Sequence, residues 1–223
     1  MDYTFTLRTI LPYIGELWPA AEQTLTLSVL AILISLAIGA GVAVLRRGRS
    51  RLGRGLAGAY VEVMRNTPLL VILYLVYFAA PGIGIRLSSF AAALIGLSLN
   101  SGGYMAEIFR AGLAAVPPGQ SEASRSLGLS ALQTFRLVAF PQVLRTIYAP
   151  LGNQFISVIL ASSLASAVAV EEVASWMETT GSTSFRFFET FLVAACVYLV
   201  LCQTVNLLRL GVGRMLFRAE AAR

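Results

Sequence analysis

The sequence predicts an all-α membrane protein with five transmembrane helices, and its composition, its uncharged stretches and the placement of its arginines all support this. Of its 223 residues, 57% are hydrophobic and 13% are charged, which is too apolar for a soluble domain of this length. Five stretches carry no charged side chain for at least 19 residues: 23–45, 66–85, 87–106, 146–170 and 190–208. Each can cross a hydrocarbon core of about 30 Å as a helix, at about 1.5 Å per residue.

The elements are expected in the following order along the chain. Residues 1–19 mix aromatic and aliphatic side chains with polar ones as far as Pro19, which is typical of a short interfacial segment on the periplasmic side. The spans are then expected at about 20–45, 62–81, 87–113, 146–170 and 188–210, with an inner loop at 117–145. A polar outer loop is expected at 173–188, and a cytoplasmic tail at 216–223 follows the transmembrane domain 20–215.

The orientation of these spans follows from the arginines, which make up all 17 basic residues. Three of them, Arg8, Arg86 and Arg186, lie on one side of the predicted spans. The other fourteen lie on the opposite side: Arg46, Arg47, Arg49, Arg51, Arg54, Arg65, Arg110, Arg125, Arg136, Arg145, Arg209, Arg214, Arg218 and Arg223. By the positive-inside rule, the N-terminus lies outside and the C-terminus lies in the cytoplasm.

Two spans carry small residues at every fourth position. They are Ala31, Ser35, Gly39 and Ala43 in the first span, and Ser157, Ala161, Ala165 and Ala169 in the fourth. Such stripes usually allow two helices to approach closely within a membrane, because small side chains leave room for backbone contact. The alternative is that they are generic residues of low volume.

Several classes of function are excluded by residues that the chain lacks. It has no histidine, so histidine-based catalysis and histidine metal ligation are not expected, and it has no lysine, which a P-loop requires. Cys196 and Cys202 share one predicted span, where small apolar packing is the simpler interpretation than a disulfide or a metal site. The net charge is +6, and the arginines that cause it flank the predicted spans. Contact with anionic membrane lipid therefore explains them better than binding to nucleic acid.

The inner loop 117–145 is expected to fold as two short helices. After two prolines, residues 120–127 can form about two helical turns, and Gly128 suits the left-handed position that ends a helix. Ser130 with a glutamine three positions later is a capping box, which starts a second helix. That helix is amphipathic and is expected to end at Pro141. A compact hairpin flanked by spans is suited to receive a push from a cytoplasmic partner.

This loop carries an ordered set of residues: Glu122, Ala123, Ser124, Gly128, Val138, Ala139, Phe140 and Pro141. The set resembles the EAA motif of binding-protein-dependent ABC importer permeases, with Ser124, Val138 and Phe140 in place of the usual Ala, Ile and Leu. The resemblance implies that the loop is a coupling helix seated in a groove of an ATP-hydrolysing subunit. It assigns this coupling to five residues: Glu122, Ala123, Ser124, Gly128 and Pro141. The alternative is a local Glu122–Arg125 pair on an exposed helix, worth only about 0.2–0.5 kcal/mol.

Further stretches resemble the signature segments of polar amino-acid permeases, the histidine, glutamine and glutamate permease family. They are 65–70, 100–112, 119–123 and 140–145, together with Pro150 and Asn153. The resemblance covers residues 20–210 and implies a type I ABC importer permease fold in the bacterial inner membrane. It also implies two ATP-binding subunits that hold ATP and Mg, a second permease subunit as homodimer or heterodimer, and an extracytoplasmic solute-binding protein. No cofactor is expected on this chain.

Polar residues within the spans are candidates for the substrate pathway, because they are costly in lipid unless they face a neighbour or a wet cavity. They are Asn66, Thr67, Asn100, Ser101, Tyr104, Ser162 and Ser163. The pair Gly102–Gly103 is expected to loosen the third span and let backbone groups reach a ligand. The alternative for each serine or threonine is a hydrogen bond back to a carbonyl of its own helix.

One departure from the family pattern bears on the cargo. Many relatives carry Lys-Asp or Lys-Asn before the serine pair of the fourth span, whereas this chain has Leu160–Ala161 before Ser162–Ser163. A cationic substrate loses its natural partner when that carboxylate is missing. The cargo implied by the resemblance is therefore a polar amino acid such as glutamate, aspartate or glutamine.

The remaining charged residues near the spans have open roles. At the outer end, Glu171, Glu172 and Glu189 are expected to contact the binding protein or to be hydrated loop charges. At the inner boundary, interhelical pairing or lipid contact is expected for Glu62, Arg65, Glu107 and Arg110.

Two other classes of protein remain as alternatives. A secondary transporter would more often carry ionisable groups inside its spans and paired repeats, and these spans are uncharged. A membrane enzyme would need a nucleophile motif or a metal cluster, for which the sequence gives no pattern. We therefore expect a transport subunit that is not itself an enzyme.

Overall fold

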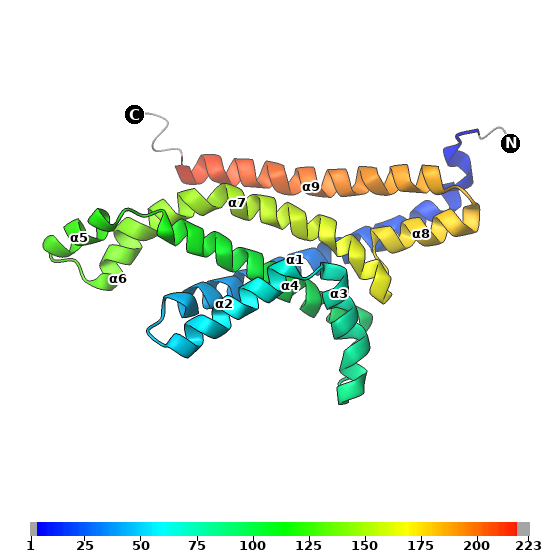
Figure 1. Cartoon of the computed structure of the whole chain (residues 1–223). Coiled ribbons are helices and arrows are strands. Elements are labelled where there is room, and N and C mark those ends of the chain that lie inside the picture. Colours follow the sequence, from blue (N-terminus) through cyan, green and yellow to red (C-terminus); the bar gives the residue numbers. More distant parts are fainter. Residues whose placement is uncertain (1–3, 218–223) are drawn as a thin grey trace.

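The computed structural model describes residues 4–217 as an assembly of helices without strands (Figure 1). The α-helices are α1 (Ile14–Arg47), α2 (Arg51–Asn66), α3 (Leu69–Tyr74), α4 (Ser89–Ala114), α5 (Pro118–Ser126), α6 (Ala131–Thr134), α7 (Phe140–Ala161), α8 (Val173–Ser184) and α9 (Phe187–Phe217). The short turns are the 3-10 helices η1 (Leu7–Thr9), η2 (Leu11–Tyr13), η4 (Ala80–Ile83) and η6 (Ser162–Val168), and the π-helical η3 (Leu75–Ala79) and η5 (Phe135–Ala139).

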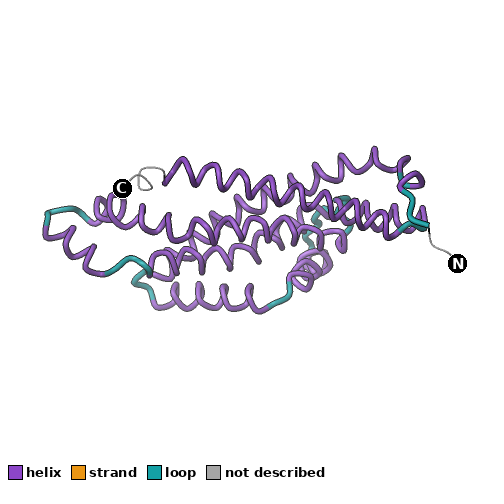
Figure 2. Tube along the Cα trace, turned by 90° about the horizontal axis from the view of Figure 1, so that it is seen from above, coloured by secondary structure: helices purple, strands orange, loops and turns teal. Residues whose placement is uncertain are grey.

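Helix α4 is the centre of the bundle, because it packs against α1, α2, α3 and α7. Helix α9 packs against α7 and α8 on one side of the molecule. The hairpin of α5 and α6 lies at the same end as the last described residues of α9, and the N-terminal segment lies at the opposite end, as both views show (Figures 1 and 2). The molecule therefore has one end that carries the hairpin and one that carries the N-terminus.

The contact between α1 and α4 depends on the small-residue stripe of α1. All four residues of the stripe are buried: Ala31, Ser35, Gly39 and Ala43. A Cβ added at Gly39 would lie 2.7 Å from the Cβ of Met105 on α4, which is too close for any larger side chain. The predicted close approach at the first stripe is confirmed, and Ser35 strengthens it by donating from Oγ to the carbonyl of Ser98 at 3.1 Å.

Three helical stretches are long and apolar enough to cross a membrane: Leu11–Arg47, Ala131–Val168 and Phe187–Phe217. A bent pair, Arg51–Asn66 with Leu69–Ile83, makes a fourth if the two parts count as one span. Helix α4 is not among them, and its middle carries the polar run 100–104. Length and composition thus support three or four spans and do not confirm the predicted five.

Near the start of the chain, the helices do not coincide with the predicted spans. Helix α1 begins at Ile14 and includes Pro19, which lies in its second turn and removes a single hydrogen bond there. The stretch 62–81 is not one straight helix, because α2 begins at Arg51 and a break at Pro68 separates it from α3. The arginines at the start of α2 make that part of the sequence look like a connection.

The predicted outer loop 173–188 is also wrong, because α8 occupies most of it. Glu172 starts this helix as its N-cap by accepting hydrogen bonds from the backbone N–H groups of Ala174 and Ser175. At the two ends of the chain, residues 1–3 of the predicted interfacial segment and 218–223 of the predicted tail lie outside the described residues.

Candidate functional site

The inner loop folds as the predicted hairpin of α5 and α6. Helix α5 has Pro118 at its first position, where the missing N–H of proline costs no helical hydrogen bond. Gly128 has a φ of 81°, in the left-handed region, and its N–H donates to the carbonyl of Arg125 at 2.9 Å. Ser130 Oγ accepts from the N–H of Gln133, whose side chain accepts from the N–H of Ser130. The left-handed glycine and the capping box are both confirmed.

The motif residues of α5 divide between its two faces. Ser124 is buried, and its Oγ donates to a backbone carbonyl one turn earlier at 2.7 Å. Glu122 and Ala123 are exposed. Within residues 4–217 the Glu122 carboxylate forms no ion pair, and Arg125 donates to the carbonyl of Ser121 at 3.3 Å. The structure thus does not form the local pair that was the alternative, and the carboxylate remains accessible to another protein.

A cavity of about 300 Å³ lies between the hairpin and the inner ends of α1 and α4. Arg47, Leu113, Glu122 and Phe135 are among the residues that line it. At one side of this cavity, Arg47 of α1 donates to the carbonyl of Leu113 of α4 at 3.2 Å. Glu122 is therefore exposed at the border of this cavity and accessible from it.

The second helix of the hairpin does not end at Pro141, contrary to the prediction. Helix α6 continues through η5 into α7, so a single helical stretch runs from Ala131 to Val168. Pro141 lies at the second position of α7, and the π-helical turn before it accommodates the proline ring and the missing N–H. Helices α6 and α7 are therefore joined through helical turns, without an intervening loop.

A second interruption lies between α2 and α3, which meet at an angle of 109°. Thr67 and Pro68 have extended backbones there. Pro68 has no N–H to donate to the carbonyl of Met64 four residues earlier, so the helical hydrogen bonds stop. Because this break lies in a predicted span, the carbonyls that it frees need partners inside the protein or in a wet cavity.

Side chains of α4 supply these partners. The Asn100 amide donates to the carbonyl of Met64 at 2.7 Å. The Tyr104 hydroxyl donates to the carbonyl of Arg65 at 3.3 Å. The amide of Asn66 donates within its own helix, to the Glu62 carbonyl at 2.8 Å. The structure thus brings together the pathway candidates Asn66, Thr67, Asn100 and Tyr104 at the break, two of them as caps of a broken helix.

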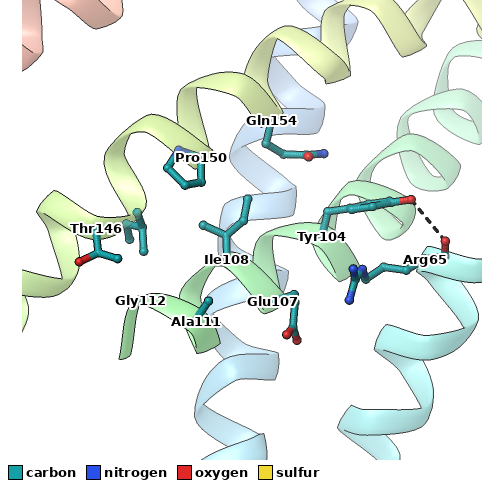
Figure 3. A pocket seen from close by; sticks show the side chains of 10 residues that line it. Arg65, Tyr104, Glu107, Ile108, Ala111, Gly112, Thr146, Pro150 and Gln154 are labelled. Carbon is teal, nitrogen blue, oxygen red and sulfur yellow. Dashed lines mark hydrogen bonds between the residues drawn. The ribbon is translucent and has the colours of Figure 1, made fainter. Parts of the chain in front are cut away.

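A cavity of about 330 Å³ opens beside the break, between α2, α4 and α7 (Figure 3). Its polar lining consists of Arg65, Tyr104, Glu107, Thr146 and Gln154. The Arg65 guanidinium lies 5.6 Å from the centre of the Tyr104 ring, on the same side as the Glu107 carboxylate (Figure 3). A cation, a carboxylate, an amide and hydroxyl groups around an apolar wall are suited to hold a small zwitterion.

Glu107 lies among three arginines at the inner end of this cavity. Its carboxylate pairs with Arg46 of α1 at 2.9 Å and with Arg110 of its own helix, and Arg65 adds a third nearby positive charge. The interhelical pairing expected for Glu107 is therefore confirmed. Of the residues that line the cavity itself, only Arg65 and Glu107 are charged, so their charges balance there.

The remaining pathway candidates do not join this cluster. The hydroxyls of Ser162 and Ser163 donate to the carbonyls of Ile159 and Leu160, each at 2.7 Å, so both serines bond back to their own helix. Ser101 is buried on α4. For Ser162 and Ser163, the structure thus shows the alternative that was expected beside a pathway role, a hydrogen bond to a carbonyl of the same helical stretch.

The pair Gly102–Gly103 does not loosen α4, contrary to the prediction. Helix α4 is continuous through both residues. A Cβ at Gly102 would lie 2.7 Å from Ile38 of α1, and a Cβ at Gly103 would lie 2.9 Å from Met64 of α2. The glycines instead let two neighbouring helices approach α4 closely, which brings the break within reach of Asn100.

At the opposite end of the molecule, two glutamates are fully buried. The Glu172 carboxylate accepts hydrogen bonds from the hydroxyls of Thr24 on α1 and Tyr198 on α9. Burial raises the pKa of Glu172 above its ordinary value, and these hydrogen bonds oppose the change. The Glu189 carboxylate accepts from the N–H of Thr6 at 3.1 Å.

These two glutamates are therefore neither hydrated loop charges nor surface contacts, and both expectations for them are wrong. They join α1, α8, α9 and the N-terminal segment. This role is not predictable from the local sequence, because partners far along the chain supply most of the hydrogen bonds. Glu171, by contrast, is exposed.

Comparisons with known proteins agree with this geometry. A family model described as "Binding-protein-dependent transport system inner membrane component" matches residues 18–216. The "Probable amino-acid ABC transporter permease protein YckA" of Bacillus subtilis (strain 168) is 36% identical over 201 residues, which cover 90% of this chain and 89% of that protein. The "L-cystine transport system permease protein TcyB" of the same organism is 32% identical, with 97% of this chain and 96% of that protein covered.

Solved structures give the same result for the fold. The "Crystal structure of an amino acid ABC transporter with histidines" matches with a TM-score of 0.88 at 32% identity, covering 96% of this chain and all of the other. A MetNI methionine ABC transporter described in inward-facing conformations matches with a TM-score of 0.77 at 19% identity, covering 92% of this chain and 98% of the other, a likeness of fold alone.

Proposed function

The chain belongs to the family of binding-protein-dependent transport system inner membrane components, and from this premise we propose that it is the membrane subunit of an ATP-driven importer of polar amino acids. As a permease of this family it is a transport subunit and not an enzyme. In the proposed assembly, two separate ATP-binding subunits hold ATP and Mg, and an extracytoplasmic solute-binding protein delivers the cargo.

The observation that carries this proposal is the protruding hairpin with an accessible carboxylate. Glu122 is exposed on α5 and has no ion-pair partner among residues 4–217. Gly128 and the Ser130 cap fix the angle between the two helices, and α6 continues directly into α7. We assign the contact with the ATPase to Glu122, Ala123, Ser124 and Gly128, and the transmission of its movement to the helix that contains Pro141.

We assign five spans to the membrane domain 20–215, with α4 as the fifth. Its 26 residues are enough to cross a hydrocarbon core, since a helix rises by about 1.5 Å per residue. Helices packed around α4 shield its polar run from lipid, which supports its placement within the membrane. The hairpin and the end of α9 lie at one end of the molecule (Figure 2), and their arginines support a cytoplasmic location for that end.

A second permease subunit, identical or related, completes the proposed route. Five spans are too few to enclose a pathway alone. Of the small residues expected as a stripe on the fourth span, Ser157 is exposed on α7 and leaves room there for a partner helix. Ala165 is buried, and Ala169 lies after the end of η6.

We propose that the substrate passes the break between α2 and α3. Broken helices are tolerated at membrane depth where they line a wet cavity, and such breaks are common at transport sites. The cavity beside the break supports this assignment. The proposed pathway residues are Asn66, Thr67, Asn100, Ser101 and Tyr104 near the break, with Ser162 and Ser163 where α7 tightens into η6.

The cargo that we favour is glutamate, aspartate or glutamine. Arg65 lines the cavity and can pair with a substrate carboxylate, whereas Glu107 is already paired with Arg46 and Arg110 and offers less to a second cation. The neutral Leu160–Ala161 pair offers no counter-charge to a basic side chain.

The coupling assignment is tested by Glu122→Ala in the complete complex reconstituted in vesicles. Loss of one charged contact of roughly 1.5–3 kcal/mol lowers ATP-dependent uptake about tenfold or more, and it weakens co-purification of the ATPase subunits. Glu178→Ala is the matched control, because it removes an exposed carboxylate from α8 at the opposite end. If uptake and ATPase attachment are unaltered in the Glu122 variant, the hairpin is not the coupling element.

The cargo assignment has a separate test. Radiolabelled glutamate or glutamine is expected to enter the vesicles in preference to radiolabelled arginine, each at the same concentration with its binding protein in excess. Uptake in which arginine outcompetes glutamate would remove this assignment while leaving the coupling intact.

A further inference from the structure

We propose that a groove between the inner ends of α7 and α9 binds the headgroup of an anionic phospholipid. The groove has a volume of about 630 Å³ and is lined by Tyr148 of α7 and by a run of residues near the end of α9. Two of the lining residues are Arg209 and Arg214. It is separate from the hairpin and from the cavity beside the broken helix, which different residues line.

Two glycines shape the groove by allowing α7 and α9 to meet closely. A Cβ at Gly152 would lie 2.0 Å from the Cδ of Arg209, so the stem of this arginine fits only over a glycine. A Cβ at Gly213 would lie 2.9 Å from the ring of Tyr148. The Tyr148 hydroxyl donates to the carbonyl of Arg209, and the Arg209 guanidinium donates to the Asn206 side chain at 2.8 Å. Arg209 is therefore held in position along the wall of the groove.

The charge of the groove is one-sided. Arg209 is the first charged residue after the uncharged stretch 190–208, and Arg214 follows on the same helix. No aspartate or glutamate is among the residues that line the groove. A phosphate group there would thus meet Arg209 and Arg214 with no competing carboxylate in the lining.

The position of the groove favours a lipid over other anions. Only 6% of the apolar window of α9 is buried, so this helix presents most of its surface outward. Leu199, Val200, Leu207 and Leu208 are 59–66% exposed and lead along α9 toward the groove. A lipid whose phosphate contacts Arg209 and Arg214 would lay its acyl chains against these residues. Basic residues just beyond an apolar span are a common site for anionic headgroups.

The affinity of the unmodified complex for lipids is the first test, measured by native mass spectrometry of the protein released from detergent. We expect phosphatidylglycerol to bind about 25-fold more tightly than phosphatidylethanolamine with the same chains, because each arginine near a headgroup contributes about fivefold. Inorganic phosphate should not displace the lipid, since it lacks the chains. Displacement by phosphate at equal concentration would identify a simple anion site and overturn the lipid assignment.

Two substitutions locate the binding in the groove. Arg209→Met keeps an unbranched stem over Gly152, and Arg214→Gln keeps a polar side chain. Each should weaken phosphatidylglycerol binding about fivefold and phosphatidylethanolamine binding less, because the ammonium group of the latter offsets its phosphate charge. Arg51→Gln is the control, because it removes an exposed arginine at the start of α2, outside the groove.

Three outcomes would contradict the proposal. Equal losses in the control and in the groove variants would indicate a general effect of net charge. Unchanged binding in the Arg209→Met, Arg214→Gln double variant would place the lipid elsewhere. A groove covered by a second permease copy or an ATPase subunit would show no preference between the two lipids in the unmodified complex, a result that does not depend on how well any variant folds.

Discussion

The turn between α5 and α6 and the break between α2 and α3 each end a helix, the first at Gly128 and the second at Pro68, but their backbone groups find partners in opposite ways. In the hairpin, Ser130 and Gln133 cap each other three positions apart. At the break, the Met64 carbonyl is capped by Asn100, which lies 36 positions along the chain. A hairpin built from local contacts can move as a unit, whereas the break is formed only once α4 has packed against it.

Because of this difference, substitutions in the two regions should have different effects. Changes in the exposed hairpin should affect coupling to a partner and leave the bundle intact. Changes at the break should lower the stability of the whole bundle, because α4 is its central helix.

The largest effect is expected from Asn100→Leu. This substitution leaves the Met64 carbonyl, in a part-buried hydrogen bond, without its donor, which costs about 1–3 kcal/mol, and thermal unfolding of the purified protein should shift down accordingly. Asn153→Leu is the matched control, since Asn153 is exposed on α7 and its side chain forms no hydrogen bond within residues 4–217. Equal shifts in the two variants would show that the cap does not hold the break.

The next largest effect is expected in the hairpin, from Gly128→Ala. A left-handed φ costs a residue with a Cβ about 1–2 kcal/mol, so hydrogen exchange should speed up across 118–139 and ATP-dependent uptake should fall. The melting temperature of the bundle should hardly change, because no neighbouring atom lies within 4 Å of the added Cβ.

The control for that variant is Gly119→Ala, which also adds a Cβ in open space but within α5, without a left-handed backbone. There, alanine should leave exchange unchanged or slow it. A bundle that unfolds together with the hairpin in the Gly128 variant would contradict the view that the hairpin is a separate unit.

The same contrast explains how much the sequence could predict. Gly128 and the Ser130 capping box were predictable, because the residues that determine them are neighbours in the chain. The direction of the chain after Pro68 was not, since the partners that satisfy it lie on α4. The helix that continues through Pro141 was missed for a related reason: a π-helical turn accommodates the ring, and nothing in the local pattern indicates such a turn.

The functional residues likewise differ in whether neighbours in the sequence or distant partners determine their surroundings. The accessible Glu122 was predicted together with its motif. The burial of Glu172 was not, because Thr24 and Tyr198 approach it from helices distant in sequence. Asn100 and Tyr104 were predicted as polar residues of the substrate pathway, but their contacts with α2 could only be seen in the folded chain.

A smaller effect is expected from Ser130→Ala, which removes one half of the capping box at a cost of about 1 kcal/mol. Exchange should speed up in the first turn after residue 130, with little change in α5. Ser126→Ala is a suitable comparison, because its hydroxyl bonds back to the Glu122 carbonyl and caps no helix start. If both variants exchange alike, the capping box does not fix the hairpin.

The smallest effect is expected from Tyr104→Phe, the second cap of the break. Its hydrogen bond to the Arg65 carbonyl is longer, at 3.3 Å, and solvent can partly replace it, so the loss should be about 0.5 kcal/mol. Phenylalanine keeps the ring beside the Arg65 guanidinium, whereas Tyr104→Leu also removes that contact, at a further cost of about 0.5–1 kcal/mol. Thermal unfolding of the two variants therefore measures the hydroxyl and the ring separately. If Tyr104→Phe destabilises the protein as much as Asn100→Leu, the two caps contribute equally and the break depends on both, not chiefly on the shorter bond to Met64.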